Sequence, residues 1–366
     1  MAHGAARGEN KRVKTLRLSV DPGQLNTAEA AAALDRAAEI LRAGGLVALP
    51  TETVYGLGAN ALDAEAVARI FAAKQRPSWD PVIVHISDLE QLDGLVDSVP
   101  ASARTLMAAY WPGPMTLLLP RSRAISDAVT SGRPLVGIRM PAHPVALELI
   151  RRAGVPVAAP SANLFSHTSP TTAAHVLADL DGRIDAIVDA GEARHGVEST
   201  VLDPTQSPIV VYRPGAVTLE QIRAVAGPAE FFHLKEKKEK IEETPHEALP
   251  SPGVGIRHYA PKARLILIED RFEALSARLV EESKKNAGER IGWMKPTELA
   301  VPEELAGAEL FTWGRWAVPA ELAHGLYAGL RALDDRGCTV ILCPLPAADG
   351  IGAAIADRLG KAARTK

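Results

Sequence analysis

The sequence predicts an α/β protein with two domains, and three observations support this prediction. Short apolar runs that favour β-strands alternate with segments of helical periodicity over residues 15–227. A second, shorter series of the same kind occupies residues 263–366. Between them, residues 235–243 read KEKKEKIEE, charged at every position but one, and a proline-containing stretch follows. This pattern is typical of an interdomain linker, although a solvated helix end followed by a loop would fit the same residues.

The elements of the first domain follow a polar and basic lead, residues 1–14, which we expect to be flexible. A helix is predicted within residues 27–45, because apolar residues recur at helical spacing between an N-cap, Thr27, and two terminating glycines. Residues 51–59, TETVYGLGA, predict a loop. The remaining helices are predicted at residues 63–76, 143–154 and 171–180, and the strands at residues 15–20, 46–50, 81–86, 116–120, 134–141, 155–160 and 186–191.

The second domain is predicted to be a small unit of the βαβ type. Its segments are the strands at residues 264–270, 291–295 and 338–346, the helices at residues 272–286 and 319–337, and a final stretch at residues 350–363.

Charge and composition exclude several classes of protein. Lys and Arg number 41 against 44 Asp and Glu, a net charge of −3, so no overall basic field exists to bind nucleic acid non-specifically. No apolar run reaches the roughly 18 residues of a membrane span, and the N-terminus lacks the apolar core of a secretory signal. The two cysteines, Cys338 and Cys343, lie at an odd offset on a predicted strand, so we expect no disulfide and a reducing cytoplasm.

The familiar catalytic motifs are absent from the sequence. It contains no P-loop, no complete dinucleotide-binding fingerprint, no HExxH or clustered Cys and His, and no GxSxG. The notable feature is instead a set of cationic side chains near the ends of apolar elements: Lys74 and Arg76 at a helix end, Arg139 between apolar strand residues, and Arg213 in VVYRPG. Lys74 and Arg76 alone could be ordinary partners of a helix C-terminus. Several arginines near strand ends favour an anionic ligand, because guanidinium matches carboxylate and phosphate in a planar fork.

Neutral donors accompany these cations. Ser161 and Asn163 lie in PSAN and Ser199 and Thr200 in EST, where they could bind anionic oxygens or serve as turn and capping residues. His85 ends the apolar run PVIVHI and could be a ligand or a satisfied core histidine.

Together these residues resemble a known family. Lys74 and Arg76 as KxR, with Ser161 and Asn163 as SxN, form the signature tetrad of the YrdC-like threonylcarbamoyl-AMP synthases. The segments PTETVYGLGANA, WPGPMTLLL, IRMPAHP, APSAN, GVEST and RPG are similar to the family's blocks over about residues 30–225. SPGVGIRHYAPKARL and DGIGAAIADRLGKAA resemble the linker and the final segment of the long, two-domain form.

The resemblance implies a fold for each domain and the residues at which each domain begins and ends. It implies a YrdC-like twisted mixed sheet with helices for the catalytic domain, residues 15–227, and a smaller Rossmann-like α/β C-terminal domain, residues 263–366. Residues 228–262 are then a linker that could act as an active-site lid, because Tyr259, a residue the resemblance places at ATP, lies within it.

The resemblance also implies an activity. Family members join L-threonine, bicarbonate and ATP, with Mg²⁺, into threonylcarbamoyl-adenylate and pyrophosphate, and a tRNA threonylcarbamoyl transferase then uses the adenylate to make the nucleoside threonylcarbamoyladenosine. The rival interpretations are a module that binds double-stranded RNA or tRNA, and a related carbamoyl-adenylate-forming hydrogenase maturation enzyme. The hydrogenase interpretation is disfavoured, because the chain lacks the acylphosphatase and Cys-rich zinc segments that such proteins carry.

The implied site residues fall into three groups. L-Threonine is expected at Thr53, His85, Arg139, the backbone of Ala159 and Ser199, with Arg139 holding the carboxylate. ATP is expected at Arg76, Ser161, Ser169, Arg213 and Tyr259, with Lys74 and Asn163 completing the tetrad around phosphates and carbamate. One departure is Asp80, where the family usually has Asn beside the nucleotide; an acid there would repel phosphate unless it binds metal or turns away, so we do not assign it to the site.

Overall fold

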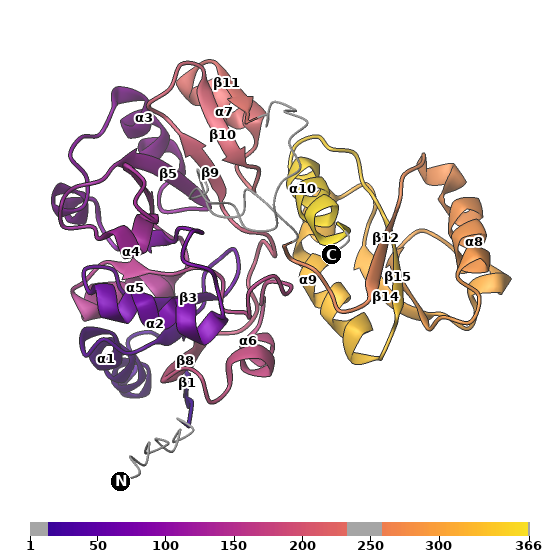
Figure 1. Cartoon of the computed structure of the whole chain (residues 1–366), viewed down its shortest axis with the longest axis horizontal. Helices are drawn as coiled ribbons and strands as arrows, with labels where there is room; N and C mark the ends of the chain where they lie inside the picture. Colours follow the sequence, from indigo (N-terminus) through magenta and orange to yellow (C-terminus); the bar gives the residue numbers. More distant parts are fainter. Residues whose placement is uncertain (1–13, 233–257, 365–366) are drawn as a thin grey trace, which may run out of the picture.

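The computed structural model describes residues 14–232 and 258–364, which form a large mixed sheet and a small parallel one, each with helices on both faces (Figure 1). The large sheet has the order β1-β8-β2-β3-β7-β4-β6-β5-β9-β10-β11. Its strands are β1 Leu16–Ser19, β2 Val47–Leu49, β3 Gly56–Asn60, β4 Ile83–His85, β5 Met115–Pro120, β6 Leu135–Arg139, β7 Val157–Ala158, β8 Ala186–Asp189, β9 Thr200–Asp203, β10 Ile209–Arg213 and β11 Ala229–Phe231.

Helices cover both faces of this sheet because each presents an apolar stripe to it. On one face, Leu34 and Leu41 of α1 and Leu149 of α5 pack with the strand residues Val47 and Val188. A separate core lies on the other face under α2, α3, α6 and α7. The helices of this domain are α1 Ala28–Arg42, α2 Ala64–Lys74, η1 Leu89–Gly94, α3 Ala101–Tyr110, α4 Asp127–Thr130, α5 Pro144–Ala153, α6 Ala173–Leu180 and α7 Leu219–Ala226.

The small sheet has four parallel strands in the order β12-β15-β13-β14. Helices α9 and α10 lie on the side that faces the first domain, and α8 lies on the outer side (Figure 1). The elements are β12 Arg264–Ile268, η2 Phe272–Ala274, α8 Leu275–Lys285, β13 Ile291–Pro296, η3 Glu303–Leu305, β14 Glu309–Gly314, α9 Pro319–Asp335, β15 Val340–Pro344 and α10 Gly352–Ala362.

The predicted fold class, a twisted mixed sheet with helices plus a smaller α/β domain, is confirmed. Thr27 caps α1 by accepting the Ala30 amide, as expected. The prediction of a loop at residues 51–59 is wrong in its second half, because residues 56–60 form β3, antiparallel to β2. β11 pairs with β10, so the large sheet takes three residues that we expected in the linker.

Some predictions fall outside the described residues. These are the basic lead up to residue 13, the charged run at residues 235–243, and most of the linker before His258. The two cysteines are both buried free thiols, as expected. Among the described helices, none is both long and apolar enough to cross a membrane.

Candidate active site

A cavity lies where several elements of the first domain end, and His258 and Tyr259 contribute to its wall. Nine of the twelve predicted site residues line it: Thr53, Arg76, His85, Arg139, Ala159, Ser161, Ser199, Arg213 and Tyr259. The other three, Lys74, Asn163 and Ser169, are buried and lie outside the described lining. The structure therefore brings the predicted residues together from widely separated segments. Nine of them line the cavity, and the other three, Lys74, Asn163 and Ser169, form a supporting layer of buried side chains outside its lining.

Arg76 enters the cavity wall because α2 ends just before it. Gln75 takes a left-handed conformation with φ of 54°, and Pro77 prevents continuation of the helix. The Arg76 guanidinium donates to the carbonyls of Asp80 and Pro81, at 3.1 and 2.7 Å. Its Nη2 also pairs with Asp80 Oδ2 at 2.9 Å, and both side chains are buried. Asp80 thus directs its carboxylate at Arg76 and does not line the cavity.

Arg139 is the last residue of β6, where its guanidinium is held on several sides. Nη1 donates to Thr53 Oγ1 at 2.9 Å, Nε donates to the Gly113 carbonyl at 3.2 Å, and Nη2 lies 2.7 Å from Glu52 Oε1. Burial opposes ionisation of Glu52, but the Arg139 charge, together with hydrogen bonds from Arg139 and the backbone, lowers the pKa of this carboxyl. Glu52 was not among the predicted site residues, although it lies between two threonines of PTETVYG.

His85 lies beside Arg139, because β4 and β6 are parallel neighbours with these two residues in register. Burial and the Arg139 charge lower the pKa of His85 to about 3, so its imidazole is neutral at physiological pH. No hydrogen-bond partner for its Nδ1 occurs in the described part of the chain. His85 thus brings a neutral, buried and unpaired ring nitrogen to the cavity wall.

Ser199 and Arg213 form a third part of the wall. Ser199 immediately precedes β9, and Arg213 is the last residue of the neighbouring strand β10. Arg213 Nε donates to the Ser199 carbonyl at 3.0 Å and Nη2 to the Ser199 hydroxyl at 3.1 Å. That hydroxyl also lies 2.8 Å from Thr116 Oγ1. These contacts fix both side chains at the cavity.

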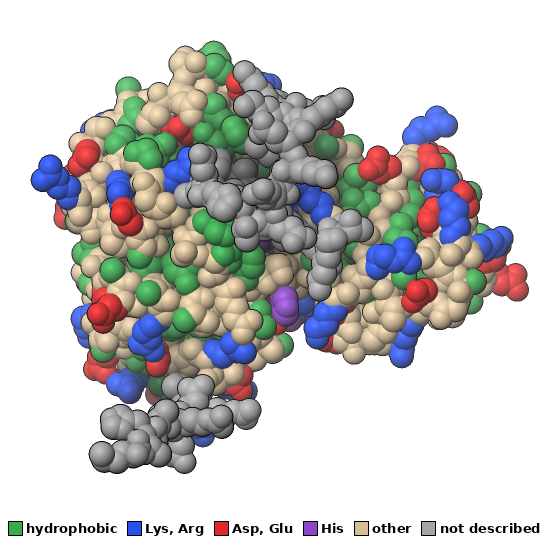
Figure 2. Space-filling view, viewed as in Figure 1, with side chains coloured by type: hydrophobic (Ala, Val, Ile, Leu, Met, Phe, Trp, Pro, Cys, Tyr) green, Lys and Arg blue, Asp and Glu red, His purple; other side chains and the backbone are tan. Residues whose placement is uncertain are grey.

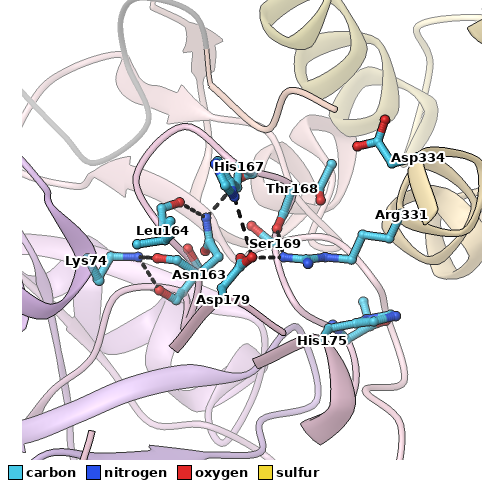
Figure 3. A network of polar contacts seen from close by, with 12 residues as sticks. Lys74, Asn163, Leu164, His167, Thr168, Ser169, His175, Asp179, Arg331 and Asp334 are labelled. Atoms are coloured by element: carbon cyan, nitrogen blue, oxygen red, sulfur yellow. Dashed lines mark hydrogen bonds and ion pairs between the residues drawn. The ribbon is translucent and has the colours of Figure 1, made fainter. Parts of the chain in front are cut away.

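Lys74 and Asn163 support the loop that carries Ser161 (Figure 3). Lys74 Nζ donates to the carbonyls of Ser161 and Asn163, each at 2.5 Å. The Asn163 amide in turn donates to the carbonyls of Leu164 and His167, at 2.7 and 3.0 Å. Burial and the Arg76 charge hold the pKa of Lys74 well below its usual value. Lys74 and Asn163, two of the four residues of the predicted tetrad, therefore direct their side chains at backbone carbonyls.

Glu198 lies where the two domains meet at the cavity. Ser169 donates to its Oε1 from the first domain. From the second domain, the Tyr327 hydroxyl lies 3.1 and 3.0 Å from the two carboxylate oxygens, and Arg358 Nε donates to Oε2 at 2.8 Å. Burial opposes ionisation of Glu198, yet the charges of Arg358 and Arg213 lower its pKa to about 2. Glu198, Tyr327 and Arg358 were not among the predicted site residues.

Tyr259 reaches the cavity through an unusual backbone conformation. Its φ is 64°, which is rare for a bulky residue. The next residue, Ala260, donates its amide to the Ser166 carbonyl at 2.8 Å, which ties this segment to the loop that follows Asn163. The described end of the predicted linker thus forms one wall of the cavity.

Two family models divide the chain between them. Residues 39–215 match the model described as "Telomere recombination", and residues 217–364 match "Threonylcarbamoyl-AMP synthase, C-terminal domain".

Individual relatives match nearly the whole chain. The chain is 45% identical over 333 residues to threonylcarbamoyl-AMP synthase from Bacillus subtilis, covering 90% of this chain and 92% of that protein. It is 42% identical over 333 residues to the protein of the same name from Pyrococcus abyssi, with 89% and 92% covered. The crystal structure of P. abyssi Sua5 complexed with L-threonine superimposes with a TM-score of 0.83 at 39% identity, covering 96% of this chain and 97% of that one. The chain therefore belongs to the threonylcarbamoyl-AMP synthase family, in its two-domain form.

Proposed function

We propose that the cavity joins L-threonine, bicarbonate and ATP into threonylcarbamoyl-adenylate and pyrophosphate. The observation that carries this proposal is the convergence of three buried arginines, Arg76, Arg139 and Arg213, on one cavity in a chain of net charge −3. A guanidinium carries five N–H donors, and the carboxylates of Asp80 and Glu52 engage only part of those of Arg76 and Arg139, so such a cavity suits ligands with carboxylate and phosphate groups. The names of the relatives support the same reaction and give no support to an RNA-binding module.

L-Threonine is proposed to bind on the Arg139 side of the cavity. Arg139 would hold the substrate carboxylate, with its orientation fixed by Thr53 and Glu52. The neutral ring of His85 and the Ala159 backbone would contact the rest of the amino acid, and Ser199 would complete this subsite. The P. abyssi relative crystallised with L-threonine supports a threonine site in this fold.

ATP is proposed to bind on the side of Arg76, Ser161, Arg213 and Tyr259. Arg213 is well placed to meet phosphate because its described hydrogen bonds are to Ser199 and not to an acid. Ser169 would act from the supporting layer through Glu198, to which it donates. Lys74 and Asn163 would position the Ser161 loop through its carbonyls.

The reaction then needs positioning more than covalent chemistry by the protein. The threonine amine and bicarbonate condense to a carbamate with loss of water. A carbamate oxygen attacks the α-phosphorus, the bond to the bridging oxygen of the β-phosphate breaks, and pyrophosphate leaves. Fixed arginines that neutralise the phosphates and align the reactants supply the rate enhancement. A nucleophilic side chain is not required.

Mg²⁺ is proposed to enter as part of the ATP complex. The described residues include no group of three or more His, Cys, Asp or Glu side chains placed to hold a metal ion. Mg²⁺ keeps several waters and commonly takes few protein ligands, so the phosphate oxygens of ATP would supply most of its other ligands. When bound, it would neutralise charge on the triphosphate.

Measurement of pyrophosphate release from ATP and bicarbonate, with and without L-threonine, tests the proposal. We expect release that depends on threonine; release without threonine, or none, would refute the synthase function. Filter binding to tRNA with and without ATP and threonine tests the RNA-binding alternative. The net charge of −3 favours small anionic substrates over a broad nucleic-acid surface. On the face seen in Figure 2, blue and red side chains are mixed over both domains.

The product is proposed to pass to a tRNA threonylcarbamoyl transferase, which completes the modified nucleoside; any tRNA contact by this chain would belong to that transfer. We also propose a cytoplasmic location, which the two buried free thiols, Cys338 and Cys343, support.

A further inference from the structure

An acidic side chain lies in the wall of a cavity that, on the proposed function, takes a polyanion. Among the described residues that line the cavity, Glu198 is the only Asp or Glu. It is ionised, because nearby arginines hold the pKa of its carboxyl near 2. A bare carboxylate here would repel a triphosphate and would attract Arg213, the cation proposed for the phosphates.

The second domain compensates this charge. Arg358 of α10 donates its Nε to Glu198 Oε2 at 2.8 Å, and only 1% of the Arg358 side chain is exposed. Tyr327 of α9 adds a neutral donor to the same carboxylate. The Arg358 guanidinium also lies 5.3 Å from the centre of the Tyr259 ring, within cation–π range. One side chain of the C-terminal domain thus contacts two residues of the cavity wall.

The Arg358 side chain is buried and does not serve as a surface charge. Its Nη1 donates to Asp357 at 2.7 Å, so the guanidinium is fixed between its own helix and Glu198. Burying a guanidinium is expensive and is compensated only by such paired contacts. Asp357 of its own helix and Glu198 of the other domain therefore fix the position of this charge together.

We propose that Arg358 is a positioning residue of the ATP site, which holds Glu198 and cancels its charge so that Arg213 and the cavity remain available to the triphosphate. This assigns the C-terminal domain a direct part in nucleotide binding. The inference rests on the proposed function, because it assumes that the anion in the cavity is ATP.

The test compares variants of the full chain in ATP binding, by calorimetry, and in the KM values for ATP and L-threonine. Arg358→Met is expected to raise the Kd and KM for ATP by about tenfold or more, with a much smaller change in KM for threonine. Arg358→Lys, which keeps the charge, is expected to restore most of the affinity. The double variant Glu198→Gln with Arg358→Met is also expected to recover ATP binding, because it removes the uncompensated charge.

Arg290→Met is the matched control, since Arg290 pairs with Glu309 at the exposed side of the same domain. It should behave as the wild type. The proposal is overturned if Arg358→Met folds and binds ATP normally, or if the double variant binds ATP as poorly as Arg358→Met. If Arg358→Met does not fold, the double variant, which buries no unpaired carboxylate, decides the question by its ATP Kd. A wild-type chain that binds ATP but releases no pyrophosphate with threonine would refute the proposed function and not this inference.

Discussion

Substitution of Lys74 by Met distinguishes a lysine that supports the site from one that touches substrate. The Lys74 amine is buried and donates to the carbonyls of Ser161 and Asn163, each at 2.5 Å. Methionine fills nearly the same volume but leaves both carbonyls without their donor. At about 1–3 kcal/mol for each buried polar group left unsatisfied, the variant should lose about 2–6 kcal/mol of unfolding free energy.

Urea denaturation followed by circular dichroism measures this loss, and Lys285→Met provides the control. Lys285 lies at the exposed end of α8 and pairs with Glu281 and Glu282 on the surface, so its loss should leave the denaturation midpoint unchanged within error. Threonine-dependent pyrophosphate release by Lys74→Met should also fall, because the loop that presents Ser161 loses its support.

The result that would refute this reasoning is a Lys74→Met variant with the wild-type midpoint and greatly reduced pyrophosphate release. Stability would then not depend on the two carbonyl contacts, and the amine would have to act on the substrates themselves. A variant destabilised as expected, but with wild-type KM values for both substrates, would show that the Ser161 loop keeps its position without the amine.

Three further predictions concern the cavity. Arg139→Ala should raise the KM for L-threonine about tenfold to a hundredfold, as expected for loss of a charged hydrogen bond, and a change in ATP kinetics alone would contradict its assignment. Arg213→Ala should instead raise the KM for ATP, with little change for threonine. Glu198→Gln should reduce the loss of unfolding free energy that the wild type shows as the pH falls below about 4.5. The pKa of Glu198 rises from about 2 when folded to about 4.5 when unfolded, so its contribution, up to about 3 kcal/mol, is present above pH 4.5 and lost as the pH falls towards 2. Denaturation midpoints of wild type and variant across that range check this, and parallel curves would exclude it.

Much of the fold could be predicted because its signals are local. Apolar runs such as residues 46–50 and 81–86 contain buried strands, and the periodic segment after Thr27 forms α1. β3 was missed because its glycines are typical of loops. The structure gives the reason for Gly58: a Cβ there would lie 2.8 Å from Val157 Cγ1 and 2.9 Å from Leu49 Cδ2. Close packing between strands, which no local pattern reveals, requires the glycine.

Part of the cavity lining could be predicted, because Arg76, Arg139 and Arg213 are cations at or near the ends of apolar helices and strands. The sequence could not reveal what each polar group faces. From the sequence, Asp80 could not be assigned a place relative to the phosphates. In the structure its carboxylate forms an ion pair with Arg76, only four residues away. Glu52, one residue from the predicted Thr53, was overlooked although it holds Arg139.

The contribution of the C-terminal domain was hidden for a different reason. Arg331 and Arg358 occur in α9 and α10 among other charged residues, a pattern that usually indicates a solvated helix face. Both are buried against the first domain: Arg331 donates to the Thr168 carbonyl and pairs with Asp179 at 2.9 Å (Figure 3), while Arg358 pairs with Glu198. These pairs join residues about 150 or more positions apart in sequence. Thr168 and Glu198 lie beside the segments that build the cavity, so separating the domains would break these pairs at the site and expose their charges and a backbone carbonyl to water. The cost of that loss makes the second domain part of the binding site's architecture.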